Sequence, residues 1–336
     1  MKKQYLFLIG IIISFVFVCC KQKQKEISTV SMPQELEDIY KELKANPKKA
    51  EPYMKLSAYY AKKGQIDSAL NNALIAVRMD STNSNAYIVL SDAYFASLNI
   101  EGSEEMLKRA ISIDKTNNEA YLKLGELYFL IKDYKNSKEI LAKAIQQETY
   151  NPKAYFIMGW NYRDEGDTSL AIRNYLIAAD QNSDYFDAYM ELGMLYHQRH
   201  NPLAVNYYNN ALNIEPNNIQ ALYNLAMFYQ ETEDYEKALE KYRMILQIDP
   251  QNKLALHNMG WIYLTGEEKY EEAVVFFTKA LEIDPNYIEA VYNRGLSSEQ
   301  LGQYDNARQD YMYALKLVNN YPLAIEGLNR LDKIRK

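Results

Sequence analysis

The stretch AYLKLGELY at residues 120–128 recurs four more times along the chain. Its counterparts follow at intervals of 34, 34, 33 and 34 residues and read AYFIMGWNY (154–162), AYMELGMLY (188–196), ALYNLAMFY (221–229) and ALHNMGWIY (255–263). A fixed period of this size indicates tandem units that stack on one another. Extending the register in both directions gives eight repeats, which end at Tyr321 and start at Ala50, Ser84, Asn118, Pro152, Phe186, Ile219, Lys253 and Ile288.

Each repeat predicts two amphipathic helices. Positions 4, 7, 8 and 11 of a repeat have the spacing of one helical face, and position 11 is tyrosine in all but the last repeat, which assigns most of the tyrosine excess to the core. Position 8 is always small and most often glycine, although glycine inside a helix costs about 1 kcal/mol relative to alanine. We therefore expect the second helix to approach closely there, so that a bulky residue at Gly159 overpacks the core by about 1–3 kcal/mol.

The seventh repeat carries a resemblance to a known family. It contains Leu256, Met259, Gly260, Tyr263, Ala273, Phe277, Ala280 and Pro285. This W-x2-L-G-x2-Y, A-x3-F, A and P pattern resembles the tetratricopeptide repeat, and the resemblance covers residues 50–321. It implies an all-α fold, a right-handed superhelical solenoid of about eight helix-turn-helix repeats. The eighth repeat departs from the pattern at Arg294, where an apolar residue is usual, which puts the packing of that repeat in question.

The segments on either side of the repeats predict capping helices, because the ends of a repeat array need polar outer faces. SMPQ at residues 31–34 is typical of a helix start, with Ser31 as the cap and a proline in the first turn, and predicts a helix in residues 33–49. Residues 322–336 predict the C-terminal capping helix, with four apolar side chains facing inward: Ile325, Leu328, Leu331 and Ile334.

The chain starts MKK, continues with an apolar stretch and contains its two cysteines side by side at Cys19 and Cys20. This arrangement is typical of a secretory signal, and the apolar stretch is short for a membrane-spanning helix, which needs about 20 residues. The segment resembles the lipobox of bacterial lipoproteins, which implies a cleaved signal peptide at residues 1–19. Cys20 is then the lipidated residue, and residues 20–32 form a flexible basic tether. An uncleaved signal anchor is the alternative interpretation.

This resemblance implies a location at the bacterial cell envelope. No aspartate follows Cys20, so the common signal for retention at the inner membrane is missing. We therefore expect a lipid anchor in the outer membrane.

The family resemblance also implies a concave groove, lined by the first helices, in which peptides or protein segments bind. Positions 5, 9 and 12 of the repeats are more apolar than a solvated surface requires. Large aromatic side chains and methionines make adaptable anchors, and the candidates for peptide binding are Phe156, Trp160, Met194, Tyr223 and Trp261. Burial of these side chains between neighbouring first helices is the alternative.

Position 6 is asparagine in each of the last three repeats, at Asn224, Asn258 and Asn293. A side-chain amide both donates and accepts hydrogen bonds, so such a ladder is able to hold an extended peptide backbone without reading its sequence. Ordinary surface asparagines are the alternative.

Several functional classes are disfavoured by the sequence. The formal charge is −6, and the acidic excess lies beyond the lysine-rich N-terminal segment, which argues against nucleic acid as a partner. His197 and His200 are spaced i, i+3, but no cysteine or third histidine lies near them to complete a metal site. Neither a phosphate-binding loop nor a nucleophile elbow is present. We therefore expect no enzymatic activity, no metal and no cofactor.

These observations together predict a non-catalytic, membrane-anchored scaffold that binds a peptide segment or a partner protein in its groove at the bacterial cell envelope. The main alternative is an envelope lipoprotein that binds a glycan or another small ligand, because aromatic side chains also stack on sugars. A further alternative is an assembly spacer whose contacts lie on the convex face.

Overall fold

The structure, a computed structural model, describes residues 32–334. Within this range every helix or strand assigned is an α-helix, eighteen in all, which confirms the predicted all-α repeat fold. The predicted signal peptide, Cys20 and all of the tether except Met32 lie outside the described residues.

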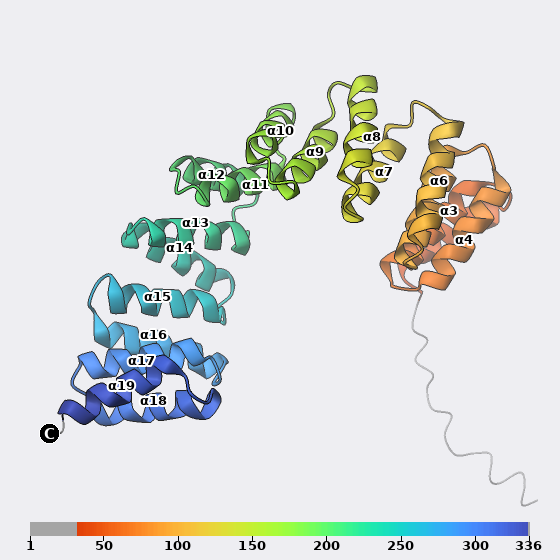
Figure 1. Cartoon of the computed structure of the whole chain (residues 1–336). Helices are drawn as coiled ribbons and strands as arrows, with labels where there is room; N and C mark the ends of the chain where they lie inside the picture. The colour runs from red at the N-terminus through yellow and green to blue at the C-terminus, as the bar shows by residue number, and fades with distance from the viewer. Residues whose placement is uncertain (1–31, 335–336) are drawn as a thin grey trace, which may run out of the picture. The chain divides into compact units, whose positions relative to one another are not determined.

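Each of the eight repeats contains a first and a second helix, as Figure 1 shows. The first helices are α3 (Ala50–Lys62), α5 (Ser84–Ala96), α7 (Asn118–Leu130), α9 (Pro152–Asp164), α11 (Phe186–His197), α13 (Ile219–Glu231), α15 (Lys253–Thr265) and α17 (Ile288–Gln300). The second helices are α4 (Ile66–Met79), α6 (Ile100–Ile113), α8 (Tyr134–Gln147), α10 (Thr168–Gln181), α12 (Leu203–Ile214), α14 (Tyr235–Ile248), α16 (Tyr270–Ile283) and α18 (Tyr304–Leu317). Every first helix begins at the residue where the sequence period starts a repeat.

The described residues form two compact bodies. The N-terminal body ends at Lys115 and contains α2 (Gln34–Ala45) to α6, and the C-terminal body starts at Thr116 and contains α7 to α19 (Pro322–Ile334). Each body has buried apolar clusters of its own, and within each body consecutive helices pack side by side. The sequence period runs through residues 115 and 116 without a change, so it does not mark this division.

The small residue at position 8 faces a large side chain on the second helix of the same repeat. A Cβ atom added to Gly193 would lie 2.5 Å from the ring of Tyr208, and one added to Gly260 would lie 2.8 Å from Phe277. Gly159 stands in the same relation to Tyr175. The close helix approach inferred from the sequence is therefore present, and glycine is the residue that leaves room for the ring.

The deepest tyrosines lie in the second helices, at repeat position 24 once repeat five, one residue shorter, and repeat seven, one residue longer, are aligned with the others. Tyr175, Tyr208, Tyr242 and Tyr311 are among the largest fully buried side chains, together with Phe277 at the same position of repeat seven. The position-11 tyrosines are mostly only half-buried, with Tyr128 as a buried member of the set. The sequence interpretation was thus right that tyrosine fills the core but gave too much of that role to position 11.

The capping helices differ in detail from the prediction. Helix α2 begins at Gln34 with Pro33 just before it and packs Ile39 against Leu56 and Tyr59, whereas Ser31 lies outside the described residues. On α19, Leu331 and Leu328 face inward as predicted, and Ala324 and Gly327 complete that face.

The inward placement predicted for Ile325 and Ile334 is wrong, because 38% and 52% of these residues are exposed. Close packing explains the difference. Gly327 lies against the ring of Tyr311, and this contact turns the small side of α19 toward the core.

Arg294, the departure in repeat eight, is accommodated by a buried partner. Its Nε and Nη2 atoms donate to the two carboxylate oxygens of Asp310 at 2.9 and 2.6 Å, and Asp310 is 8% exposed. This two-pronged ion pair replaces the apolar contact that is usual in the family. The eighth repeat therefore packs tightly despite the charged residue.

Candidate functional site

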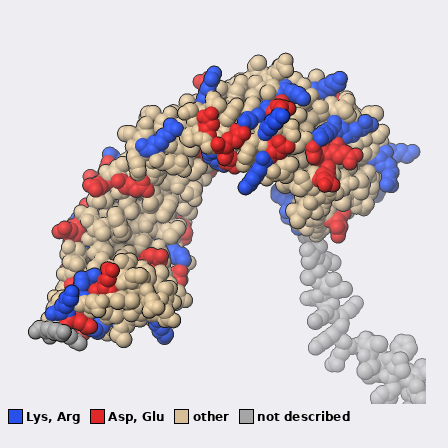
Figure 2. Space-filling model, in the orientation of Figure 1, with Lys and Arg blue, Asp and Glu red and all other residues tan. Residues whose placement is uncertain are grey.

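The predicted binding residues all lie on the first helices of the C-terminal body. We call the surface formed there by repeat positions 2, 5, 6, 9, 12 and 13 the first-helix face. Over α13–α15 the side of the molecule seen in Figure 2 carries few charged side chains. Trp160, Met194, Tyr223 and Trp261 are half-buried on this face, so part of each side chain packs in the core and part remains accessible.

Phe156 does not belong to the accessible surface. Only 4% of it is exposed, and its ring centroid lies 4.7 Å from Trp160, 4.9 Å from Tyr185 and 5.5 Å from Tyr175. Its expected place among the groove anchors is corrected here: the neighbouring aromatic rings cover it. The adjacent Trp160 stacks on Phe129 of the preceding repeat at 5.4 Å, so burial between neighbouring first helices accounts for part of the apolar stripe.

The three asparagines do not form a row of free amides. The Nδ2 group of Asn258 donates to the hydroxyl oxygens of Tyr223 and Tyr242 at 3.1 and 3.0 Å. Asn293 Nδ2 donates to Nε2 of His257 at 3.2 Å, and His257 Nδ1 donates to Asn258 Oδ1 at 3.2 Å. These bonds join repeats six, seven and eight, so two of the three amides have a structural role.

Asn224 is the exception among the three. Its Oδ1 atom accepts a hydrogen bond from the exposed Gln220 at 2.8 Å, on the same turn of α13. A bond of this kind exchanges readily with solvent or with a ligand, so Asn224 is the rung best placed for peptide binding. Whether any of the asparagines holds a peptide stays a prediction.

His257 lies at the centre of the amide network and is neutral there. Burial lowers its pKa below the ordinary value, and the hydrogen bond with Asn258 offsets only part of this effect. The ring also packs against Tyr287 and Phe277, with centroids 4.9 and 5.5 Å away. A neutral ring with the proton on Nδ1 satisfies both asparagines, which explains why the network accepts a histidine at this position.

The buried tyrosines of position 24 follow a rule that the sequence interpretation missed. The hydroxyl of Tyr242 donates to Gln230, that of Tyr311 donates to Glu299, and that of Tyr208 bonds to His197, and all three partners occupy position 12. Where position 24 is Phe277, position 12 is the buried Leu264. The signal was present in the sequence, because a polar residue at position 12 accompanies tyrosine and an apolar one accompanies phenylalanine.

Repeat four breaks this rule. Position 12 is Arg163, which donates from Nη1 to Glu191 Oε1 at 2.6 Å, and Glu191 also accepts from Trp160 Nε1 at 3.2 Å. The hydroxyl of Tyr175 and the second oxygen of Glu191 are buried without a partner in the protein. The accessible edge of Trp160 is therefore held in place by a partly buried charge pair.

Residues 32–334 contain neither a candidate metal centre nor a candidate membrane span. No group of three or more histidine, cysteine, aspartate or glutamate side chains has a geometry that holds a metal ion there. No helix in the same range combines the length and the apolar character needed to cross a membrane.

Comparison with protein families identifies the repeats. Four tetratricopeptide repeat models match residues 119–148, 158–202, 217–286 and 276–309, which together span half of the chain. A 76-residue stretch is 40% identical to the uncharacterized protein ycf37 of Pyropia yezoensis, and this stretch makes up 22% of the chain and 43% of that relative. The chain thus spans less than half the length of this relative.

Two solved structures share the fold. The C-terminal part of a TPR repeat-containing protein from Cytophaga hutchinsonii is 19% identical, with a TM-score of 0.60 over 71% of this chain and 98% of that one. The pilF protein of Pseudomonas aeruginosa is 18% identical, with a TM-score of 0.52 over 60% of this chain and 92% of that one. With the repeat models matched to half of the sequence and the helix pairs in place, the chain belongs to the tetratricopeptide repeat family.

Proposed function

We propose that this protein is a non-catalytic scaffold that binds an extended segment of a partner protein along the first-helix face of its C-terminal body. The observation that carries the proposal is the half-buried row on α9 to α15, which includes Trp160, Met194, Tyr223 and Trp261. Each of these side chains is fixed by packing on one side and accessible on the other. Such anchors bind with little loss of conformational freedom, which favours binding of a segment across several repeats.

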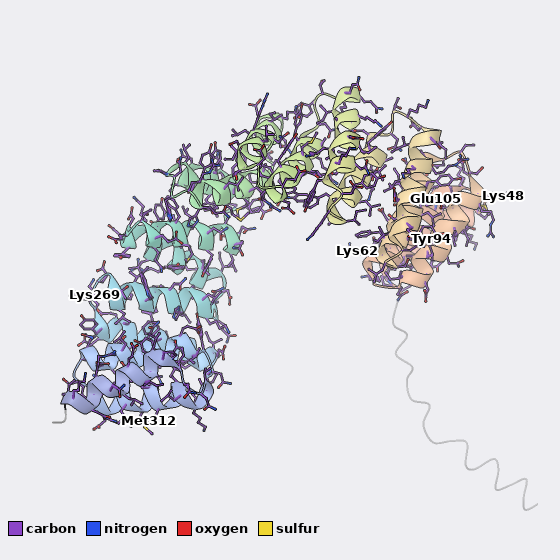
Figure 3. All side chains as sticks on the ribbon, in the orientation of Figure 1. Lys48, Lys62, Tyr94, Glu105, Lys269 and Met312 are labelled. Atoms are coloured by element: carbon purple, nitrogen blue, oxygen red, sulfur yellow. The ribbon has the colours of Figure 1, made fainter. Side chains whose placement is uncertain are left out.

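Position-specific photo-crosslinking tests this proposal without disturbing the core. A photoreactive residue replaces either Gln220 or Thr265, both exposed on the first-helix face. Matched controls replace Arg243 on α14 or Met312 on α18, a 59% exposed side chain that Figure 3 shows projecting away from its helix. In cell-envelope extract, Gln220 and Thr265 should crosslink the same partner, and the controls should not.

The captured protein is then identified and tested directly. A synthetic segment that spans its crosslinked residues should bind the purified full chain. Crosslinks from Arg243 and Met312 alone would move the interaction to the second helices and contradict the proposal. A chain that crosslinks no protein at all but binds an immobilised glycan panel would favour the receptor interpretation instead.

We also propose that the scaffold is anchored to the bacterial envelope, in the outer membrane, through a lipid on Cys20. The support is the sequence alone: the basic start, the short apolar stretch and the lipobox-like residues before Cys20. Metabolic labelling with an alkyne fatty acid should mark the wild-type protein and a Cys19→Ser variant but not a Cys20→Ser variant. Labelling that persists in Cys20→Ser would show that this assignment is wrong.

A further inference from the structure

A pocket opens on the first-helix face between α11 and α13. Its volume is about 380 Å³, and its lining consists of Met194, His197, Gln198, His200, Tyr208, Asn224 and Glu231.

The pocket lies at the repeat that is one residue shorter than its neighbours. Helices α11 and α12 have 12 residues each, whereas the first and second helices of the other repeats have 13 and 14. The turn between them passes through His200, whose φ of 48° lies in the left-handed region. The pocket thus lies at the C-terminal end of α11, and Glu231 at the end of α13 and Asn224 in the middle of α13 also line it.

A fixed chain of polar side chains forms one wall. His197 Nε2 lies 2.9 Å from Glu231 Oε2, and His197 Nδ1 lies 3.3 Å from the hydroxyl of Tyr208. Because an ionised carboxylate only accepts, a neutral His197 carries its proton on Nε2, and Tyr208 donates to Nδ1. The imidazole also packs edge-on against Phe228, with centroids 5.2 Å apart. These contacts hold Glu231 in place while 39% of its side chain stays exposed.

The electrostatics of the pocket favour a cation. Its lining contains the carboxylate of Glu231 and no lysine or arginine, and no lysine or arginine in residues 32–334 forms an ion pair with Glu231. His197 is the last residue of α11 and Glu231 the last residue of α13, so the negative poles of two helices meet at the pocket. The thioether of Met194 offers an apolar wall beside these charges.

We propose that this pocket binds a basic side chain, lysine or arginine, of the segment held on the first-helix face. The aliphatic stem lies against Met194, and the cationic head pairs with Glu231 at the helix ends. The proposal rests on the proposed function, because it names a specificity element of the same surface. It adds that the partner segment carries a basic residue opposite repeats five and six.

Methyl NMR of the full chain with labelled methionine tests the proposal without a known partner. The Met194 signal is assigned as the resonance that disappears in Met194→Leu. The probes are N-acetyl-lysine methylamide and N-acetyl-arginine methylamide, with the uncharged N-acetyl-norleucine methylamide as the reference. The two cationic probes should shift the Met194 signal at concentrations at least about 10-fold lower than the norleucine probe requires. This ratio corresponds to about 1.4 kcal/mol of binding free energy.

Glu231→Gln is the decisive variant, because its amide keeps an acceptor for His197 and removes the charge. It should abolish the preference for the cationic probes, whereas Glu233→Gln, an exposed change outside the pocket lining, should leave the preference intact. Equal shifts from norleucine, no shift from any probe, or an unchanged preference in Glu231→Gln would each overturn the proposal.

The outcomes separate this inference from the proposed function. Photoreactive residues at positions 220 and 265 that crosslink a partner, together with a Met194 signal that does not respond to the cationic probes, would support the scaffold function and contradict the pocket assignment. If the Met194 signal responds to the cationic probes but no segment of any partner binds the first-helix face, the result would support the pocket assignment and contradict the proposed function.

Discussion

At the scale of the residue, the glycines of position 8 and the rings of position 24 determine how closely each helix pair packs. A Cβ atom added to Gly159 meets the fully buried ring of Tyr175 at a distance that real Cβ atoms do not show. Repeat six has Ala226 opposite Tyr242, and both residues are fully buried as well, so that helix pair already accommodates a methyl group. The spacing of each helix pair is therefore matched to its own residues.

Gly159→Ala should destabilise the protein, although alanine is the better helix former. The overpacking should cost about 1–3 kcal/mol of unfolding free energy, measured from urea unfolding curves. Ala226→Gly is the matched control and should lose about 1 kcal/mol through helix propensity and about 0.8 kcal/mol through the loss of its buried methyl group. A Gly159→Ala variant more stable than the wild type would refute the close-packing account.

The hydroxyl groups of the same rings make a second prediction at this scale. Tyr242→Phe removes a donor to Gln230 and an acceptor for Asn258, and leaving those groups unsatisfied should cost about 1–3 kcal/mol. Tyr175→Phe removes a hydroxyl that has no partner in the protein, so its cost should be clearly smaller. Urea unfolding of the two variants gives the comparison, and equal losses would contradict it.

At the scale of the element, the C-terminal helix α19 is held by a charge cluster. Arg330 donates from Nε and Nη2 to the two oxygens of Glu299, each at 2.8 Å, and the hydroxyl of Tyr311 donates to the same carboxylate. Burial opposes ionisation of Glu299, but the hydrogen bonds from Arg330 and Tyr311 outweigh it and hold the pKa of this carboxyl below its ordinary value of 4.5. The cluster thus fixes α19 to repeat eight.

Arg330→Met should release this helix in a pH-dependent way. A carboxyl with a lowered folded-state pKa contributes stability above its ordinary pKa and loses that contribution as the pH falls through the folded-state value. The variant should therefore be less stable than the wild type by about 1–3 kcal/mol at pH 7, and the difference should shrink below pH 4.5. Thermal unfolding from pH 7 to pH 3 measures it, with Arg308→Met, which removes an exposed pair with Asp332, as the control. A difference that is constant with pH would contradict the assignment to Glu299.

At the scale of the whole molecule, the division into two bodies determines how far a local change spreads. Repeat arrays gain stability from each repeat and from its contacts with neighbouring repeats. Because each body has buried clusters of its own, a defect inside the C-terminal body should lower the stability of that body first.

Hydrogen exchange on Gly159→Ala tests this expectation. Amides of α9, α10 and the adjacent helices should lose protection, because the overpacked repeat opens more often. Amides of α3 to α6 should keep their wild-type protection. An equal loss of protection in α3 to α6 would show that the chain unfolds as one cooperative unit.

The sequence by itself determined the all-α repeat fold, the first residue of every first helix and the small residues of position 8. These features depend on local periodicity, which a helix face imposes on every repeat alike. It also placed Trp160, Met194, Tyr223 and Trp261 on the first helices, on the face where the structure leaves them half-buried.

Only the tertiary structure decided which of these side chains remain available. Phe156 is covered by the rings of Trp160, Tyr175 and Tyr185, and Asn258 and Asn293 are engaged by His257 and the tyrosines of neighbouring repeats. The pocket between α11 and α13 and the division after Lys115 likewise arise from packing between repeats. Helical periodicity records which face a residue lies on. Its partners lie on other helices, 16 positions away for Asn258 and Tyr242 and 36 for Asn293 and His257, so exposure and hydrogen bonding are set only once the helices stack.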